Sequence, residues 1–235
     1  MPNQEKGRME ERSARIPFDG LTLEGDLALP ANAKGVVVFA HGSGSSRFSR
    51  RNQAVARKLQ DAGFATLLLD LLTQDEEKAE ARTGHSRFDI ELLSLRLAAA
   101  TEWVVAQPGL AGLPVGYFGA STGAAAAIVA AAMLPDVVGA VVSRGGRPDL
   151  AGSALGDLRA PTLLIVGGAD TVVMDLNHEA LRRLRCIARL EIVPRAGHLF
   201  EESGALEKVS GLARQWFREY LADRYARMRQ LSGAR

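Results

Sequence analysis

A serine set between two glycines is the residue of this chain best suited to act as a nucleophile. Ser121 stands in the segment Gly119-Ala120-Ser121-Thr122-Gly123, which follows an apolar run and leads into an alanine-rich stretch. The pattern predicts a strand, a tight turn and a helix, with glycines that keep neighbouring side chains clear of the strained serine backbone. A helix N-terminus favours developing negative charge, and the N–H of Thr122 would face an oxyanion there. We interpret Ser121 as a candidate nucleophile and Thr122 as a candidate oxyanion donor.

The same glycines allow two other interpretations. They could form a turn that only permits close packing of a helix on a strand. They could also form a nucleotide-binding loop, because Gly116, Gly119 and Gly123 lie between a strand and a helix. The nucleotide alternative lacks the order G-x-G-x-x-G, and no acidic residue ends a following strand about 20 residues further on. The packing alternative stays open.

A serine hydroxyl needs an adjacent base to remove its proton, and the base needs a third group to fix its tautomer. His198 follows the last predicted strand, and Asp170 ends the strand before it. The resulting chain order, Ser then Asp then His, is the one expected when such a triad is built on an α/β sheet. All three residues would lie at the C-terminal ends of strands, where open α/β sheets bind ligands. Asp175 is the nearest alternative acid.

A second oxyanion donor is expected in the loop that follows an earlier strand, His41-Gly42-Ser43-Gly44-Ser45-Ser46. Small residues there let the backbone approach a reacting carbonyl, and we assign the N–H of Ser43 as the donor. His41 precedes the nucleophile, so we expect it to brace this loop by hydrogen bonding rather than to act as the base. His85 and His178 are expected to be solvated. A phosphate loop is disfavoured because no Lys-Ser or Lys-Thr pair follows the glycines.

Short apolar runs alternate with helix-length amphipathic segments along most of the chain. Continuous apolar runs suit strands buried on both faces, and the helices between them supply the crossovers that a parallel sheet requires. Upstream, alternating apolar residues around Asp19-Gly20 predict an antiparallel hairpin. The sequence therefore predicts an α/β fold with a mostly parallel, doubly wound sheet. The predicted buried runs are 35–40, 64–72, 113–118, 137–142, 161–166 and 190–193.

The composition fits one globular domain. The chain has 235 residues, of which 47% are hydrophobic and 24% charged. We expect a polar N-terminal tail over residues 1–13, one domain over 14–222 and a basic C-terminal tail over 223–235. Lysine and arginine total 29 against 27 acidic residues, and no interior face concentrates the excess, which argues against a nucleic-acid partner. The single cysteine, Cys186, excludes an intrachain disulfide.

The distribution of apolar residues also bears on localisation. Residues 1–13 lack the apolar stretch of a secretory signal, and no apolar run approaches the roughly 20 residues that span a bilayer. We expect a cytoplasmic protein that does not bind a membrane, either a monomer or a homodimer.

Four segments together resemble a known family. They are HGSGSS at residues 41–46, GYFGASTG at 116–123, GGAD at 167–170 and AGH at 196–198. The chain is similar, from about residue 14 to residue 221, to the dienelactone hydrolase-like branch of the α/β-hydrolase superfamily. The resemblance implies an α/β-hydrolase fold, and hydrolysis of an ester, lactone or thioester through an acyl-enzyme with no cofactor. Dienelactone hydrolases proper carry a cysteine nucleophile where this chain has Ser121, so their substrate is not carried over.

The expected substrate is therefore a small-molecule carboxylic ester, lactone or thioester, and no metal is expected. The alternative is a non-catalytic member of the same fold that binds a small ligand in its pocket.

The surroundings of the site give one more candidate. Many enzymes of this fold insert a helical cap after the sixth strand, but residues 144–160 leave no room for one. Only loops, chiefly 72–87 and 171–177, are then expected to cover the site, with the charged stretch 74–82 as a solvated loop. Arg144 leaves the strand end on the catalytic side, where an arginine could bind a substrate carboxylate with two hydrogen bonds. An ion pair of Arg144 with Asp149 or another local acid is the alternative, and both stay open.

Overall fold

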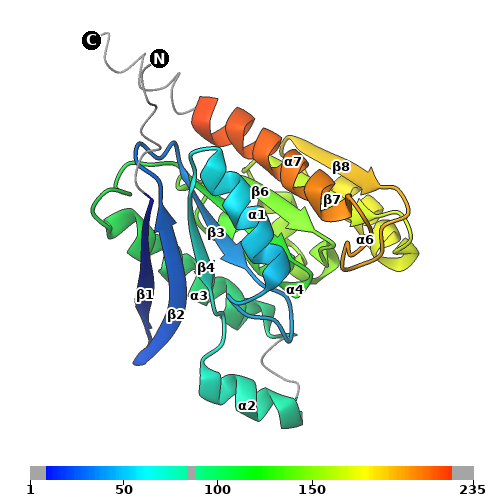
Figure 1. Ribbon diagram of the computed structural model, residues 1–235. Coiled ribbons are helices and arrows are strands. Elements are labelled where there is room, and N and C mark those ends of the chain that lie inside the picture. The colour runs from blue at the N-terminus through cyan, green and yellow to red at the C-terminus, as the bar shows by residue number, and fades with distance from the viewer. Residues whose placement is uncertain (1–8, 84–87, 224–235) are drawn as a thin grey trace, which may run out of the picture.

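A single eight-stranded sheet runs through the molecule (Figure 1) in the order β1-β2-β4-β3-β5-β6-β7-β8. The computed structural model describes residues 9–83 and 88–223. The six strands from β4 to β8 in this order pair parallel with their neighbours. By contrast, β2 pairs antiparallel with both β1 and β4. The strands are β1 (Glu10–Phe18), β2 (Leu21–Leu29), β3 (Val36–Ala40), β4 (Ala65–Leu69), β5 (Val115–Ala120), β6 (Val138–Arg144), β7 (Thr162–Gly167) and β8 (Ala188–Val193).

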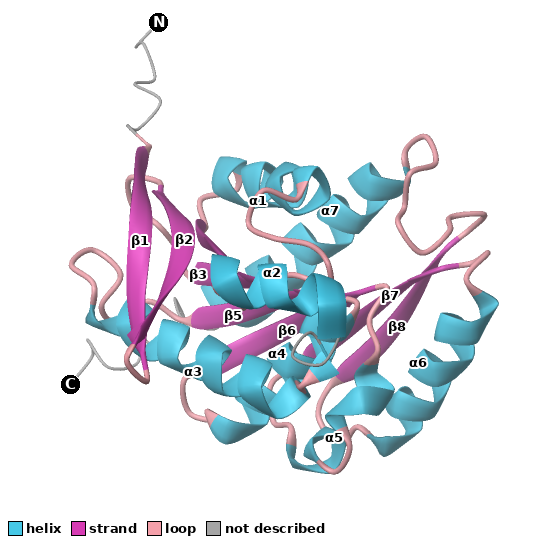
Figure 2. Cartoon of the chain, turned by 90° about the horizontal axis from the view of Figure 1, so that it is seen from below, coloured by secondary structure: helices cyan, strands magenta, loops and turns pink. Residues whose placement is uncertain are grey.

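Helices cover both faces of the sheet (Figure 2). On one face lie α1 (Arg50–Asp61) and α7 (Ala205–Phe217), and on the other lie α3 (Ile90–Ala106), α4 (Thr122–Met133) and α6 (Thr171–Arg183). This is the mostly parallel, doubly wound sheet that the sequence predicts, and the fold is that of the α/β-hydrolases. No helix in the described part of the chain is both long enough and apolar enough to cross a membrane.

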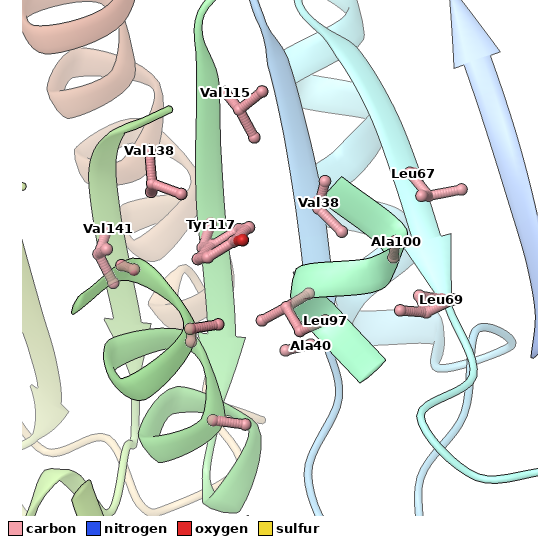
Figure 3. Packing of buried hydrophobic residues seen from close by; sticks show 14 of the residues in the cluster. Val38, Ala40, Leu67, Leu69, Leu97, Ala100, Val115, Tyr117, Val138 and Val141 are labelled. Carbon is pink, nitrogen blue, oxygen red and sulfur yellow. The ribbon is translucent and has the colours of Figure 1, made fainter. Parts of the chain in front are cut away.

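The central strands are buried because each presents apolar side chains to both helical layers. Val38 and Tyr117 contribute to the cluster shared with α3 and α4, part of which Figure 3 shows. Their neighbours Phe39 and Phe118 point the other way and stack against one another under α1 and α7, with ring centroids 4.9 Å apart. Each such side chain contributes roughly 1.5 to 3 kcal/mol by its burial. The sheet is therefore a rigid support for loops at its C-terminal edge.

The N-terminal hairpin forms as predicted, around Asp19 and Gly20, whose φ angles of 44° and 73° suit a tight turn between antiparallel strands. Its ladder pairs Glu10 with Leu29, so β1 is as long as β2. Residues 10–13, expected as part of a polar tail, are therefore strand. The basic tail expected from residue 223 lies outside the described residues, apart from Asp223.

The stretch expected as a solvated loop forms a helix instead, α2 (Gln74–Thr83). Thr73 and Glu76 make a reciprocal capping box: the N–H of Glu76 donates to the Thr73 hydroxyl, and the Glu76 carboxylate accepts the N–H of Thr73. Glu76 also receives two hydrogen bonds, of 2.6 and 2.7 Å, from the buried guanidinium of Arg96 on α3. These bonds lower the pKa of Glu76 to about 2. Among the described residues, α2 packs extensively on no other element, and Figure 1 shows it standing off from the body of the molecule.

The connection from β6 to β7 is short and carries no cap. It holds only a 3-10 turn (Pro148–Ala151) and the four-residue helix α5 (Ala154–Asp157). The expectation that loops alone border the site is wrong, because residues 74–83 form α2 and residues 171–177 begin α6.

Candidate active site

Ser121 lies on a sharp turn between β5 and α4 with strained backbone angles, φ 51° and ψ −122°. A non-glycine residue rarely adopts this conformation, and its cost is of the order of 1 to 3 kcal/mol. The turn fits only because its neighbours lack side chains: a Cβ on Gly119 would lie 2.4 Å from the Cα of Ala124, and one on Gly123 would lie 2.3 Å from the carbonyl oxygen of Ala40. The glycines thus allow close packing and also place the serine at the edge of the sheet.

His198 and Asp170 meet across two neighbouring strand ends. Asp170 precedes the first residue of α6, and its Oδ2 lies 2.7 Å from Nδ1 of His198. A bond at Nδ1 holds the imidazole with Nε2 available to accept a proton. Asp175, the alternative acid, is exposed on α6 and makes no hydrogen bond or ion pair with His198 among the described residues.

Two consecutive residues, Arg144 and Gly145, connect the Ser121 turn to His198. The N–H of Ser121 donates to the carbonyl of Arg144 at 3.2 Å. The next residue, Gly145, packs against the histidine, since a Cβ there would lie 3.5 Å from Nδ1 of His198. In the described part of the chain, the Ser121 hydroxyl makes no hydrogen bond with His198. Such contacts are often long in a free enzyme and tighten when substrate binds.

The two expected oxyanion donors lie beside one another. Thr122 is the first residue of α4, so its N–H has no partner within the helix. The N–H of Ser43 approaches Thr122 from the β3–α1 loop, where it donates to the Thr122 hydroxyl at 2.9 Å. The sequence did not indicate this bond. Any oxyanion that uses the N–H of Ser43 must therefore replace the Thr122 hydroxyl as its acceptor.

His41 braces this loop, as the sequence predicts, and lies too deep to serve as a base. Its Nδ1 lies 2.9 Å from the carbonyl of Gly42, and its Nε2 accepts the N–H of Leu71 at 3.0 Å. A backbone N–H can only donate, so Nε2 is unprotonated and Nδ1 carries the hydrogen. Burial lowers the pKa of His41 below its ordinary value. The neutral imidazole therefore ties the β3–α1 loop to the segment after β4.

This lowered pKa predicts a loss of stability in acid. The unfolded chain protonates His41 near pH 6.5, whereas the folded protein resists protonation until a lower pH. The unfolded state therefore binds more protons below pH 6.5, and the free energy of unfolding falls there by up to about 1.4 kcal/mol per pH unit. Urea unfolding at intervals from pH 7.5 to 5 measures this slope. The variant His41→Gln should lack it, and equal slopes in both proteins would assign the acid sensitivity to other groups.

Arg47 and Asp70 fix the other end of the β3–α1 loop, and the sequence analysis missed both. Asp70 follows β4 and accepts the backbone N–H of Arg47 at 2.6 Å, while its second oxygen pairs with the Arg47 guanidinium. Glu24 and Asp26 of β2 lie 3.4 and 3.6 Å from the same guanidinium. Burial is the main cause that raises the pKa of Asp26. No local pattern reveals this cluster, because its members come together only through the order of the strands.

A cleft of about 290 Å³ lies next to this loop. Its walls come from the β3–α1 loop, the end of β4 and the first turns of α2, so the helix missed by the sequence analysis borders it. Gly42, Ser43 and Thr122 line a narrow hollow beside it, together with Glu77 of α2. The cleft is lined by His41, Ser45, Ser46, Arg47, Phe48, Asp70, Leu72, Gln74, Glu77 and Lys78.

Arg144 does not form the ion pair with Asp149 that the sequence left open. Asp149 instead accepts two hydrogen bonds, of 2.9 and 2.7 Å, from Arg147. Arg144 itself is 8% exposed. Within the described ranges, no group of three or more histidine, cysteine, aspartate or glutamate side chains is placed to hold a metal ion.

Comparison with known proteins supports the same fold. A model of the dienelactone hydrolase family matches residues 23–221, which include Ser121, Asp170 and His198. A crystal structure of a dienelactone hydrolase from Anabaena variabilis superimposes with a TM-score of 0.89 at 57% identity, over 91% of this chain and 99% of that one. A cold-adapted esterase from an Arctic intertidal metagenomic library shares the fold at 17% identity, with a TM-score of 0.75 over 93% of this chain and 98% of that one.

The names of two curated relatives describe a transferase rather than a hydrolase. Two proteins from strains of Mycobacterium tuberculosis, each named putative phosphoribosyl transferase, are 54% identical over 213 residues. The match covers 91% of this chain and 47% of each relative, so the chain spans about half the length of the curated relatives it matches.

Proposed function

Because this chain belongs to the dienelactone hydrolase family, we propose that it is a serine hydrolase that cleaves a small carboxylic ester, lactone or thioester. The observation that carries the proposal is the hydrogen bond of 2.7 Å between Asp170 and His198, next to a serine on a strained turn. A family of hydrolases fits this geometry, and the choice of serine as nucleophile and of an ester as substrate is our inference.

In the proposed reaction, Nε2 of His198 takes the proton of the Ser121 hydroxyl as its oxygen attacks the substrate carbonyl carbon. The carbonyl oxygen becomes an oxyanion and accepts the N–H groups of Thr122 and Ser43. The bond to the leaving group then breaks, and His198 returns its proton to the departing oxygen or sulfur. Water repeats the sequence on the acyl-enzyme, which releases a carboxylic acid and restores the serine. Asp170 keeps the imidazole in the productive tautomer throughout.

The bond between Ser43 and Thr122 gives this mechanism one exchange step. The N–H of Ser43 leaves the neutral Thr122 hydroxyl and binds the oxyanion, which is a charge-assisted and therefore stronger acceptor. The exchange favours the transition state over the ground state, because a neutral substrate carbonyl competes less well for the same N–H.

Transfer of a phosphoribosyl group, which the name of the curated relatives suggests, is not part of this proposal. The name belongs to proteins of which this chain matches 47%. A serine, a histidine and an aspartate in this order suit acyl transfer.

A fluorophosphonate probe tests whether Ser121 is activated. Such probes label a serine quickly only when a base has made it nucleophilic, so we expect labelling of the native protein at Ser121, located by peptide mass spectrometry. p-Nitrophenyl esters from acetate to octanoate then report acyl preference. A protein that binds these esters but neither hydrolyses them nor takes up the probe would be the non-catalytic ligand-binding member instead.

A further inference from the structure

The guanidinium of Arg96 lies inside the protein, between α2 and the segment that follows β4. Arg96 belongs to α3 and is only 2% exposed. Two of its hydrogen bonds go to Glu76 and hold α2 on the body of the molecule. A third bond runs from Nη1 to the backbone carbonyl of Leu71, at 2.9 Å. The ion pair with Glu76 already neutralises the buried charge, so the bond to Leu71 is not needed for that purpose.

Leu71 lies in a buried, irregular segment, and its backbone depends on two side chains. The residue is outside β4 and α2, so no ladder or helix supplies partners for its N–H and C=O. Buried backbone groups need such partners. The N–H of Leu71 donates to Nε2 of His41 at 3.0 Å, and the carbonyl accepts the bond from Arg96. No other hydrogen bond to the Leu71 backbone occurs within the described ranges. His41 and Arg96 therefore fix this segment together.

The bond from Leu71 also selects the tautomer of His41. Because Nε2 accepts an N–H, the ring hydrogen is on Nδ1, which donates to the carbonyl of Gly42 at 2.9 Å. With the hydrogen on Nε2 instead, the lone pair of Nδ1 would face the lone pairs of that carbonyl oxygen and repel them. The position of Leu71 therefore decides whether His41 attracts or repels the Gly42 carbonyl.

The Gly42 carbonyl shares one peptide group with the N–H of Ser43, the proposed oxyanion donor. A trans peptide is planar, so its C=O and N–H point in opposite directions, and a bond that fixes the carbonyl also fixes the N–H. This peptide lies against the serine turn, because a Cβ on Gly42 would lie 2.9 Å from the Cβ of Ser121. A donor that is aimed in advance at the oxyanion lowers the barrier to reaction. The direction of the Ser43 N–H is therefore what this series of bonds controls.

We propose that Arg96 is a positioning residue for the N–H of Ser43. It acts in two steps, through the backbone of Leu71 and the ring of His41, and the inference rests on the proposed hydrolase function. Without Arg96 the buried Leu71 carbonyl lacks a donor, and the segment turns to find one. The Leu71 N–H then leaves Nε2, His41 adopts both tautomers, and the peptide that carries the oxyanion donor is free to rotate. The alternative is that Arg96 serves only to attach α2 through Glu76, in which case its loss leaves the oxyanion donor unchanged.

An ester and its thionoester test this role. The oxyanion formed from p-nitrophenyl acetate is a strong hydrogen-bond acceptor, whereas p-nitrophenyl thionoacetate places the charge on sulfur, a weaker acceptor. In Arg96→Met, kcat for the ester should fall about ten- to a hundredfold with KM unchanged, because the interaction is made only in the transition state. The complete loss of one oxyanion donor costs about a hundred- to a thousandfold, and Arg96 only aims the donor. The ratio of ester to thionoester turnover should fall as well, and equal fractional losses on both substrates would overturn the proposal.

Thr73→Ala is the matched control for the attachment of α2. It removes the hydroxyl that caps this helix and bonds to Glu76, and it leaves the bonds of Arg96 in place. The ratio of ester to thionoester turnover should stay at its native value in Thr73→Ala. A fall as large as in Arg96→Met would assign the effect to α2 and would contradict the positioning role.

A double-mutant cycle tests whether Arg96 acts through His41. His41→Phe keeps a ring at this position but removes both nitrogens, so the series of bonds is already broken in this variant. In the His41→Phe background, Arg96→Met should therefore lower kcat by less than about twofold, since the effects of coupled residues do not add. Losses that multiply in the double variant would mean that the two residues act independently, and the proposal would be wrong.

Nitrogen NMR of His41 in isotope-labelled protein measures the tautomer without turnover. The native ring should carry its hydrogen on Nδ1 alone, and Arg96→Met should show both tautomers, with faster hydrogen exchange at the Ser43 amide. If the native protein hydrolyses neither substrate yet the tautomer shifts in this way, the hydrolase proposal fails, and the control of the Ser43 N–H by Arg96 stands. If the ester is hydrolysed and the tautomer is unchanged in Arg96→Met, the positioning role is wrong. Should Arg96→Met fail to fold, Arg96→Lys gives the same comparisons, with a smaller change in the same direction, because one nitrogen cannot reproduce the geometry of the bonds to Leu71 and Glu76.

Discussion

The variant Ser121→Ala should lose ester hydrolysis by roughly 10⁴- to 10⁶-fold in kcat while keeping its fold. The size of the loss follows from the role of the hydroxyl, because removal of the nucleophile from a serine triad leaves only the catalysis that binding and the oxyanion donors supply. Alanine has the same Cβ as serine, so the backbone strain at φ 51° is unchanged, and the Ser121 side chain makes no hydrogen bond among the described residues that would be lost. The measurement is kcat on p-nitrophenyl acetate, together with the melting temperature.

A second serine serves as the matched control. Ser153 precedes α5, and its side chain does not cap that helix. Ser153→Ala should retain full activity and full fluorophosphonate labelling. Activity that persists in Ser121→Ala would remove Ser121 from the mechanism, and a large drop in melting temperature would show that the turn needs the hydroxyl for stability.

The second large effect is expected for Asp170→Asn, with a loss of about 10⁴-fold in kcat. Asparagine has nearly the shape of aspartate, but its amide can donate to Nδ1 of His198, which favours the tautomer with the hydrogen on Nε2. That tautomer cannot accept the serine proton. The substitution also removes the negative charge that stabilises the imidazolium as it forms. The hydrogen bond of 2.7 Å between the two side chains is the structural basis of this expectation.

Asp175→Asn is the matched control for this variant, because Asp175 is the alternative acid and stands exposed one turn into α6. It should change kcat by less than about twofold. The values of kcat of the two variants are compared at pH 7.5, after circular dichroism has shown that both are equally folded. This comparison decides between the two acids. If Asp175→Asn loses activity while Asp170→Asn retains it, the acid is misassigned.

The sequence predicts those features that depend on short segments or on chain order. The serine turn is local, since Gly119 and Gly123 are required within two residues of Ser121. The fold follows from apolar runs separated by helical segments, and the family follows from the resemblance carried by the four motifs; both are confirmed. The roles of Ser121, Asp170 and His198 in catalysis stay predictions that the variants above test.

The features that escaped prediction depend on pairings between distant segments. Asp70 reaches Arg47 because β4 lies next to β2 and β3. Likewise, Nε and Nη1 of Arg144 have no partner among the described residues, which appears only when every neighbouring side chain is placed. The start of β1 at Glu10 reflects the length of its partner strand rather than its own polar sequence. The helix α2 is a different case, because the capping box from Thr73 to Glu76 was present in the sequence and its charged composition concealed it.

The attachment of α2 has a consequence for how this scaffold can change over evolutionary time. The helix borders the cleft, yet among the described residues it is joined to the body chiefly through Arg96 and the first-turn carboxylate of Glu76. The sheet and the loops that hold Ser121, Asp170 and His198 do not depend on it for their packing. Under the proposed function, insertions or exchanges that keep Glu76, the partner of the buried Arg96, can therefore reshape the border of the cleft at little risk to folding, while the chemistry of the site is inherited unchanged.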